Sequence, residues 1–258
     1  MDLELTDKVA FIAGSSRGIG HEIAHRFLRE GARVVISGRE KEHVERTGDE
    51  LAAQFGREKI LQLVGDLTHA DFIRDSIEKV LSAWGKIDAL VANIGSGRAA
   101  PGWQFEPEEW MRIYEVNLFG SMRLTQALLP HFVKNKEGSM VLIGSIAGIE
   151  ATKAPLGYGS AKAALAHYGK NLARQLGAEG VRVNVVAPGN ILFPGGTWET
   201  HLYERQEQVT RYIESEVPLR RFGKPEEIAD FVVFLCSPRA SFATGMILAI
   251  DGGQVRSI

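Results

Sequence analysis

Short hydrophobic segments alternate along the chain with longer segments in which hydrophobic residues recur at helical spacing. Most short segments are hydrophobic at every position, as expected for strands of a parallel sheet covered by helices on both faces. Regular alternation of strand and helix favours right-handed crossovers and a doubly wound sheet. The expected strands are Val9–Ala13, Val34–Ile36, Ile60–Val64, Ala89–Ala92, Met140–Ile143, Val181–Val186 and Met246–Ile250.

The segment after the first expected strand has the pattern of an amphipathic helix. Ile19, Ile23 and Phe27 fall on one face, and Gly31 is expected to end the helix as its C-terminal cap. No linker, repeat or low-complexity tract interrupts the 258 residues, so we expect one domain over residues 1–258.

Composition excludes several classes of function. The 30 Lys and Arg residues nearly balance the 32 Asp and Glu residues, so neither nucleic acid nor a membrane surface is expected as a partner. No hydrophobic run approaches the ~18 residues of a membrane span, and no signal peptide is visible, so we expect a cytoplasmic protein. The single cysteine, Cys236, stands in a hydrophobic context and is expected to be a buried structural thiol.

The least regular stretches are residues 96–107 and 188–200, both rich in glycine and proline. Loops beyond the C-terminal ends of strands are where doubly wound sheets bind ligands. We therefore expect these stretches to border a ligand site, with a substrate lid within residues 188–216.

A glycine-rich turn, AGSSRGIG, follows the first expected strand. Gly14, Gly18 and Gly20 allow unusual backbone angles and a close approach of phosphate to the backbone, while the following helix directs its first N–H groups at the phosphate. The spacing differs from the general G-x-G-x-x-G fingerprint, but the strand before it and the helix after it favour dinucleotide binding over a simple turn. We expect the neighbouring Ser16 and Ile19 to contribute to the same site.

The end of the second expected strand indicates which dinucleotide binds. An acid is expected there for NAD(H), yet the strand ends in Gly-Arg. Arg39, assisted by Arg17, has the charge and fork geometry to pair with a 2′-phosphate. Alternatively, Arg39 merely begins a solvated helix and Glu40 serves a ribose hydroxyl. NADP(H) is favoured over NAD(H).

Asp66 and Leu67 follow the third expected strand and are expected in the cofactor site. The Asp66 carboxylate could accept a hydrogen bond from the adenine amine, cap the following helix, or do both.

Tyr158 and Lys162 are four residues apart, so they share one face of a helix. A tyrosine with its ordinary pKa of about 10 is a poor acid–base catalyst, and a nearby cation lowers that pKa. The phenol could then exchange a proton with a carbonyl or alcohol oxygen. Ser145 follows the fifth expected strand, where its hydroxyl could bond the same oxygen. On its own, this spacing favours a surface tyrosine beside a solvated lysine.

Together, AGSSRGIG, the serine of LIGSIAG, YGSAK and the PG after the sixth strand resemble the short-chain dehydrogenase/reductase family in order and approximate spacing. The resemblance covers nearly the whole chain and is strongest to 3-oxoacyl-[acyl-carrier-protein] reductases. It implies an α/β, single-domain Rossmann fold: a doubly wound, seven-stranded parallel sheet with helices on both faces.

The resemblance also implies catalytic roles. Tyr158 would be the acid–base, Lys162 would lower its pKa and bond the nicotinamide ribose, and Ser145 would orient the carbonyl. Asn117 would hold a water in a proton relay to Lys162.

Further cofactor contacts are implied after the fourth strand. Asn93 and Gly95 match a family segment that usually has the sequence Asn-Asn-Ala-Gly, from which Ala92 and Ile94 depart. Asn93 is expected to support the sheet and the cofactor rather than the chemistry.

Pro188 and Gly189 match the family's PG, and Ile191 is expected to hold the nicotinamide through its backbone. Phe193 stands where the family often has a threonine that binds the nicotinamide carboxamide, and Thr197 is the candidate replacement.

Three aromatic and three basic residues are candidates for the substrate pocket. The aromatic residues either line the pocket or pack the lid onto the core, and the basic residues either meet an anionic substrate or are solvated. These residues are Trp103, Phe193, Trp198, Arg98, His201 and Arg205.

We expect an NADP(H)-dependent oxidoreductase that interconverts a carbonyl and a secondary alcohol, similar to 3-oxoacyl reductases. Sugar, polyol and steroid dehydrogenases of the same family remain alternatives, as does a non-catalytic dinucleotide-binding sensor. His131, His167 and Tyr168 form no metal-binding spacing, and no metal is expected. The resemblance implies a homotetramer or dimer, joined by paired long helices and the C-terminal strand region.

Overall fold

The computed structural model describes residues 1–100 and 102–257, so position 101 of the irregular stretch 96–107 lies outside the described residues. Seven parallel strands form one sheet in the order β3-β2-β1-β4-β5-β6-β7. The strand order reverses between β1 and β4, which is the point where doubly wound sheets bind ligands. The strands are β1 Val9–Ala13, β2 Arg33–Gly38, β3 Ile60–Val64, β4 Ala89–Ala92, β5 Gly138–Ile143, β6 Val181–Pro188 and β7 Ile247–Ile250.

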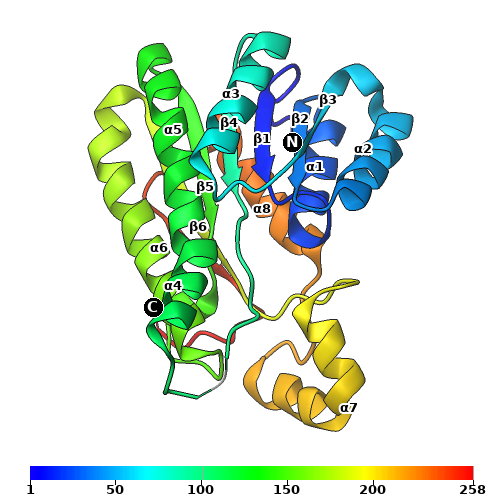
Figure 1. Ribbon diagram of the computed structural model, residues 1–258, viewed down its shortest axis with the longest axis vertical. Coiled ribbons are helices and arrows are strands. Elements are labelled where there is room, and N and C mark those ends of the chain that lie inside the picture. The colour runs from blue at the N-terminus through cyan, green and yellow to red at the C-terminus, as the bar shows by residue number, and fades with distance from the viewer. Residues whose placement is uncertain (101, 258) are drawn as a thin grey trace.

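Helices cover both faces of the sheet (Figure 1), which confirms the predicted fold class. Helices α1, α2 and α8 pack on one face, and α3, α5 and α6 pack on the other. Within the described residues, no helix combines the length and hydrophobicity needed to cross a membrane. The helices are α1 Gly18–Arg29, α2 Lys41–Phe55, α3 Ala70–Trp84, α4 Pro107–Tyr114, α5 Gly120–Asn135, α6 Leu156–Leu176, α7 Thr197–Glu216 and α8 Pro225–Cys236.

The continuous hydrophobicity of the strands follows from burial on both faces. In β1, Val9 and Phe11 join the core beneath α3, α5 and α6, whereas Ala10 and Ile12 join the core beneath α1, α2 and α8. Because side chains alternate between the two faces of a strand, every position of β1 is buried, and burial on both faces favours hydrophobic residues.

All seven predicted strands are present, with shifted ends. β2 extends from Arg33 to Gly38 and β6 continues to Pro188, whereas Met246 lies outside β7. The C-cap residue of α1 is Glu30 rather than the predicted Gly31. Gly31 follows it and completes the helix end, with a φ of 82° and an N–H that donates to the Leu28 carbonyl at 3.0 Å.

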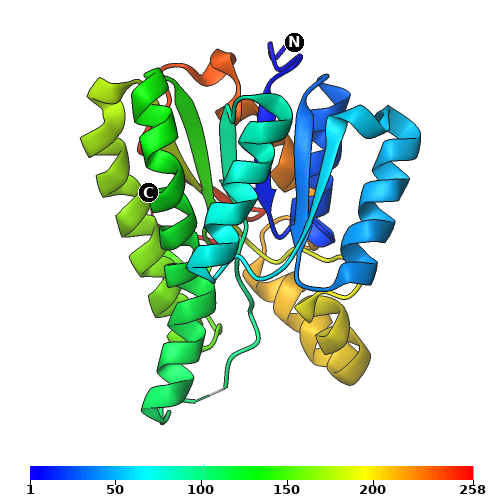
Figure 2. The ribbon, with the colours of Figure 1, turned by 45° about the horizontal axis from the view of Figure 1, so that its top comes forward.

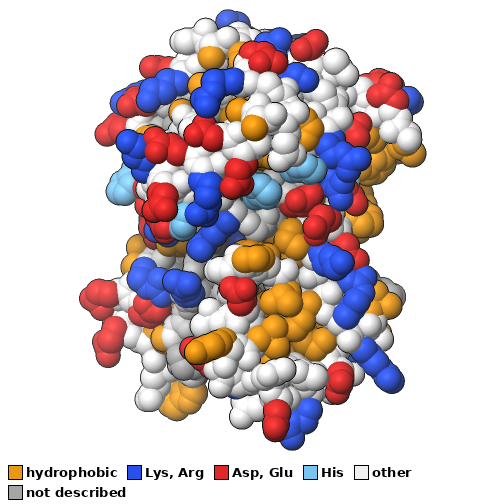
Figure 3. Space-filling view, turned by 90° about the vertical axis from the view of Figure 1, so that its right-hand side faces the viewer, with side chains coloured by type: hydrophobic (Ala, Val, Ile, Leu, Met, Phe, Trp, Pro, Cys, Tyr) orange, Lys and Arg blue, Asp and Glu red, His pale blue; other side chains and the backbone are white. Residues whose placement is uncertain are grey.

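Helix α7 projects beyond the C-terminal ends of the strands (Figure 2). It has a small hydrophobic core of its own, separate from the hydrophobic clusters that cover the two faces of the sheet. Viewed from the right of Figure 1, hydrophobic side chains gather on the lower part of the molecule, where α7 lies, and mostly charged side chains lie above it (Figure 3). The residues of this lid core are Val209, Ile213 and Val217, with Trp198, Leu202, Tyr212 and Phe222 packed against them.

Candidate active site

The glycine turn between β1 and α1 leaves no room for side chains. Gly14 and Gly18 have φ values of 66° and 58°, a region that favours glycine. A Cβ atom on Gly14 would lie 2.8 Å from the Asn93 carbonyl oxygen, and one on Gly20 would collide with the Gly14 carbonyl. Among the described residues, no side chain caps the first turn of α1. This turn therefore fits the phosphates of a dinucleotide.

Asn93 ties the end of β4 to the glycine turn, because its side-chain amide donates to the Gly14 carbonyl at 2.9 Å. Two residues later, a Cβ atom on Gly95 would lie 3.0 Å from Lys162 Nζ and 3.1 Å from Asn117 Oδ1. The segment after β4 therefore brings the glycine turn, Asn117 and Lys162 to one place.

Asn117 lies in a π-helical turn, Glu115–Phe119, between α4 and α5. Its side chain is 2% exposed, donates to the Ile113 carbonyl at 3.0 Å and accepts from the Ser96 N–H at 2.9 Å. Such turns occur frequently at functional sites, because the extra residue redirects side chains within a helix. Here the Asn117 amide is fixed in one orientation.

Lys162 is 3% exposed and lies 5.9 Å from the centre of the Tyr158 ring. Its ammonium group donates to the Ile143 carbonyl at 2.8 Å. Burial lowers the pKa of Lys162 to about 8, because the charged form loses its hydration. The lysine is therefore easier to deprotonate than a solvated one.

Tyr158 shows the opposite pKa direction from the one predicted. Burial raises the pKa of its phenol, and the Ser145 hydroxyl lowers it without overcoming that effect. The Lys162 charge is not among the causes of this shift in the geometry seen here, and its predicted effect on the phenol stays a prediction. The pKa is raised because the phenol is desolvated while the ammonium is directed at the Ile143 carbonyl.

Ser145 begins the short helical turn Ile146–Gly148 directly after β5. Its oxygen accepts the Ala147 N–H at 3.2 Å, which leaves the hydroxyl proton available to another acceptor. Ser145, Tyr158 and Lys162 thus converge from the end of β5 and the first turns of α6. Two hydroxyl groups beside a buried amine can bind and protonate a carbonyl oxygen.

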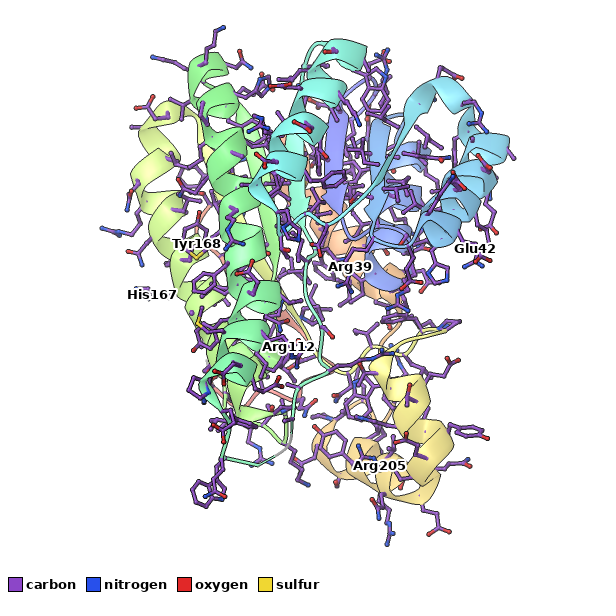
Figure 4. All side chains as sticks on the ribbon, in the orientation of Figure 1. Arg39, Glu42, Arg112, His167, Tyr168 and Arg205 are labelled. Carbon is purple, nitrogen blue, oxygen red and sulfur yellow. The ribbon has the colours of Figure 1, made fainter. Side chains whose placement is uncertain are left out.

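The adenosine end of the predicted cofactor site lies beside β2 and β3. Arg39 is exposed and lies toward the edge of the sheet where the strands end (Figure 4). Burial acts to raise the pKa of Asp66, but hydrogen bonds from the Thr68 N–H at 2.9 Å and hydroxyl at 2.8 Å, together with the Arg39 charge, lower it overall. Asp66 does not cap α3, since the N-cap residue is His69, so that alternative is wrong. Leu67 is buried in the core.

Arg17 lies against the lid: its guanidinium donates to the Gly195 carbonyl at 3.4 Å. Ser16 and Ile19, beside it, contact α2 and the core. The Ser16 carbonyl accepts the Thr47 hydroxyl at 2.8 Å, and Ile19 packs against the core under α1.

The segment after β6 is held firmly. β6 ends at Pro188, and the Gly189 N–H donates to the Ile250 carbonyl at 3.0 Å. The Ile191 side chain is buried, and Ile191 pairs with Gly223 in an isolated bridge. Only the backbone of Ile191 is therefore well placed to meet a ligand.

The three aromatic candidates behave differently. The Phe193 ring lies against the glycine turn, 2.5 Å from where a Gly18 Cβ would be, and it also packs on the core. Trp198 packs within the lid core, so packing of the lid is the correct interpretation for both residues. Trp103 is 76% exposed, and its predicted place in the pocket is wrong. Thr197 Oγ1 lies 3.6 Å from where a Gly97 Cβ would be, so the two irregular stretches meet there.

Of the basic candidates, Arg98 and Arg205 are exposed, and the pKa of half-buried His201 is lowered by burial and by Arg205. His167 and Tyr168 lie on α6, away from α7 (Figure 4).

Two remaining residues have structural roles. The His131 ring bonds the Ile87 backbone. Cys236 is buried, as predicted, and burial raises the pKa of its thiol to about 12. Within residues 1–100 and 102–257, no group of three His, Cys, Asp or Glu side chains could hold a metal ion.

Two backbone groups of the site were missed by the sequence analysis. The Ile143 carbonyl accepts from Lys162, and the Ser96 N–H donates to Asn117. Backbone groups leave no residue-type signal in a sequence, so only the folded geometry identifies them.

Comparisons with known proteins place this geometry in context. A family model described as enoyl-(acyl carrier protein) reductase matches residues 13–254. The chain is 35% identical over 254 residues to the 3-oxoacyl-[acyl-carrier-protein] reductase FabG of Thermotoga maritima, covering 98% of this chain and 100% of the relative. It is 34% identical over 261 residues to the 7alpha-hydroxysteroid dehydrogenase of Escherichia coli K12, covering 100% and 98%.

Among solved structures, the chain resembles L-sorbose reductase from Gluconobacter frateurii, crystallised in complex with NADPH and L-sorbose. The TM-score is 0.90 with 31% sequence identity, and the alignment covers 100% of both chains.

Proposed function

Because the chain belongs to the short-chain dehydrogenase/reductase family and is an oxidoreductase that acts on CH–OH groups, we propose that it is an NADP(H)-dependent reductase of 3-oxoacyl-type carbonyl compounds. The observation that carries the proposal is the convergence of Asn117, Ser145, Tyr158 and Lys162 beside Gly95. A purely dinucleotide-binding sensor would have no need for this arrangement. The whole chain, including a lid within residues 188–216, is proposed to act as one domain.

The chain's own residues would handle the proton, while a bound nicotinamide would supply the hydride. Ser145 would orient the carbonyl oxygen by donating its hydroxyl proton. Tyr158 would transfer its phenolic proton to the same oxygen as negative charge develops there. Lys162, charged below a pH of about 8, would stabilise the resulting phenolate, and Asn117 would orient a water toward it.

The cofactor would lie at the C-terminal ends of the strands, across the point between β1 and β4 where the strand order reverses. Gly14, Gly18 and Gly20 would cradle its phosphates, and Arg39 would pair with a 2′-phosphate, with Arg17 beside it. Asp66 would accept from the adenine amine through the oxygen that Thr68 does not bind. Support for NADP(H) comes from the exposed Arg39 at the tip of β2 and from the NADPH complex of the sorbose reductase.

The remaining proposed contacts lie around the nicotinamide end. Asn93 and Gly95 would border the ring, while Pro188, Gly189 and the Ile191 backbone would hold it from the other side. Sugar and steroid alcohols are alternative substrates, supported by the named activities of the sorbose reductase and the hydroxysteroid dehydrogenase.

The test is NADPH oxidation, followed by absorbance, with ethyl acetoacetate, acetoacetyl-CoA, L-sorbose and a 7-oxosteroid. Crotonyl-CoA, an enoyl thioester, serves as the comparison because the family model is described by an enoyl reductase. We expect turnover with the 3-oxo compounds and none with crotonyl-CoA, since the site directs its proton donors at an oxygen.

Tyr158→Phe should lower kcat by roughly 10²–10⁴-fold, the usual contribution of a general acid, with little change in NADPH affinity. Tyr168→Phe is the matched control, because Tyr168 lies on the same helix and its hydroxyl bonds Thr125 instead. Binding of NADPH without turnover of any compound would favour the sensor, and an active Tyr158→Phe variant would refute the assigned role.

We also propose that the protein is a homotetramer or a dimer. β7 is an edge strand, and strand edges with hydrophobic surroundings tend to pair with another chain. Large hydrophobic side chains are exposed around β7 and α8. These residues are Phe231, Phe234, Phe242, Met246 and Ile247.

A further inference from the structure

The lid helix α7 is bent. Arg205 has φ −151° and ψ 52°, which are not helical values, and it separates residues 197–204 from residues 206–216. A sharp bend in a helix has an identifiable structural cause, and here a side-chain contact joins the two halves. Trp198, before the bend, stacks on Tyr212, after it, with ring centres 5.7 Å apart and planes at 16°. This stack holds the two halves of α7 at the angle seen in the structure.

Tyr212 also connects the lid to two distant parts of the chain. Lys153, in the loop after Ser145, places its ammonium group 5.2 Å from the ring centre. Gln254, near the C-terminus, donates its side-chain amide to the Tyr212 hydroxyl at 2.9 Å. One side chain therefore receives contacts from the active-site loop, the C-terminal segment and the first half of the lid.

The connection continues to the segment that is proposed to hold the cofactor. The Gln254 side-chain carbonyl accepts from the Asn190 amide at 2.6 Å. Asn190 is 8% exposed and lies beside Ile191. Its own carbonyl accepts the Gly223 N–H at 2.9 Å, so its backbone is held independently of Gln254.

Ion pairs at the end of α7 add less. Glu216 lies 3.5 Å from both Lys153 and Arg256, but both cations are largely exposed. Exposed pairs of this kind contribute little to stability. Among these polar contacts, those of Tyr212, Gln254 and the buried Asn190 therefore contribute more to the position of the lid than the ion pairs do.

We propose that Tyr212 and Gln254 are positioning residues for the reductase reaction, an inference that rests on the proposed function. They fix the bend of α7 against the Asn190 segment. The bend sets where Thr197 lies, and the Thr197 hydroxyl faces Gly97 across the mouth of the site. Neither positioning residue contacts Tyr158 or Lys162, so their loss affects how substrate is held rather than the proton transfer.

The test compares Tyr212→Phe, Gln254→Leu and the double variant. Tyr212→Phe removes one neutral hydrogen bond and Gln254→Leu removes two, and we expect either variant to raise KM for ethyl acetoacetate by about threefold to tenfold. The value of kcat and the affinity for NADPH should change by less than about twofold, because the Gly223 N–H still holds the Asn190 backbone. Since both substitutions break the same bond, the double variant should be no worse than Gln254→Leu.

Matched controls come from the same helix. Tyr203→Phe alters a tyrosine that is 94% exposed, and Gln208→Leu alters an exposed glutamine. Both should leave KM unchanged. Gln254→Glu should have a KM close to that of the wild type, since a carboxylate can accept both from the Asn190 amide and from the Tyr212 hydroxyl.

A second measurement does not need turnover. Trypsin should cleave after Arg205 several-fold faster in Tyr212→Phe and Gln254→Leu than in Tyr203→Phe, in protein without substrate. Equal cleavage rates, additive effects in the double variant, or a KM for Tyr212→Phe equal to that of Tyr203→Phe would overturn the proposal. If the wild type turns over no carbonyl compound, the proposed function fails, and the cleavage rates still decide whether these residues fix the lid.

Discussion

Single residues of the site owe their properties to burial more than to charge pairing. Lys162 has a pKa lowered to about 8, and the pKa of Tyr158 is raised, both mainly by desolvation. Each shift favours the neutral form of its group, so in this state the Tyr158 phenol keeps its proton. A negative charge that develops on the phenol would in turn favour a protonated Lys162, because opposite charges stabilise each other at low dielectric.

At the same scale, Arg39 is the residue proposed to select NADP(H) over NAD(H). Arg39→Asp should lower NADPH affinity by tenfold or more, roughly the value of a charge-assisted hydrogen bond, and should raise NADH affinity. Fluorescence titration with NADPH and with NADH measures the ratio of the two affinities. Arg46→Asp makes the same charge change on exposed α2 and should have a much smaller effect. An unchanged NADPH/NADH ratio in Arg39→Asp would remove Arg39 from the phosphate site.

At the scale of elements, local interactions at helix ends connect the lid to the sheet. The first turn of α8 is closed by Glu227, which accepts the Lys224 N–H at 2.8 Å and pairs with Arg221. These bonds also fix the strand-like segment around Gly223 that pairs with Ile191. The start of α8 thereby supports the backbone proposed to hold the nicotinamide.

The lowered pKa of Glu227 predicts that the stability of the protein depends on pH. The Arg221 and Lys224 hydrogen bonds lower its pKa from 4.5 to about 2, so its stabilisation is complete above pH 4.5 and is lost as the pH falls through about 2. Glu227→Gln should reduce the free energy of unfolding at pH 7 by about 0.5–1 kcal/mol, because the pair is partly exposed. Denaturation in urea at several pH values measures this loss of free energy of unfolding.

The control for that measurement is Glu226→Gln in the same turn. We expect a smaller loss for it, and a difference between wild type and Glu227→Gln that shrinks toward pH 2. A difference independent of pH would show that the carboxylate charge is not the cause.

At the scale of the whole molecule, the sheet determines which parts of the chain meet. The parallel strands deliver the glycine turn, Asn93, Ser145 and Pro188 to one edge, and α7 projects beside that edge. The outer strand β7 leaves a hydrophobic border that a second copy could cover.

The proposed assembly gives a test at this scale. Phe242→Glu combined with Met246→Lys should reduce the mass measured by light scattering after size exclusion. Phe242 is fully exposed and Met246 lies outside the strand, so folding of each chain should be preserved. Trp103→Glu, at an exposed aromatic residue elsewhere, should leave the mass unchanged. A wild type of monomeric mass would contradict the proposed assembly.

The sequence by itself determined the strands, the sheet class and the glycine turn. These features depend on local patterns: runs of residues buried on both faces, helical spacing, and positions where only glycine is tolerated, as at Gly14 and Gly18. Tyr158, Lys162 and Ser145 were also identifiable as candidates, because their motifs match the family in order and spacing, although the spacing of Tyr158 and Lys162 alone would not have singled them out.

Only the tertiary structure decided the pKa directions at Tyr158 and Lys162, the place of Trp103 and Phe193, and the contacts of Tyr212. Desolvation depends on everything packed around a group, and the Tyr212–Gln254 bond joins residues 42 positions apart. No local pattern encodes such contacts, because they form only when the sheet and the lid have brought separate parts of the chain together.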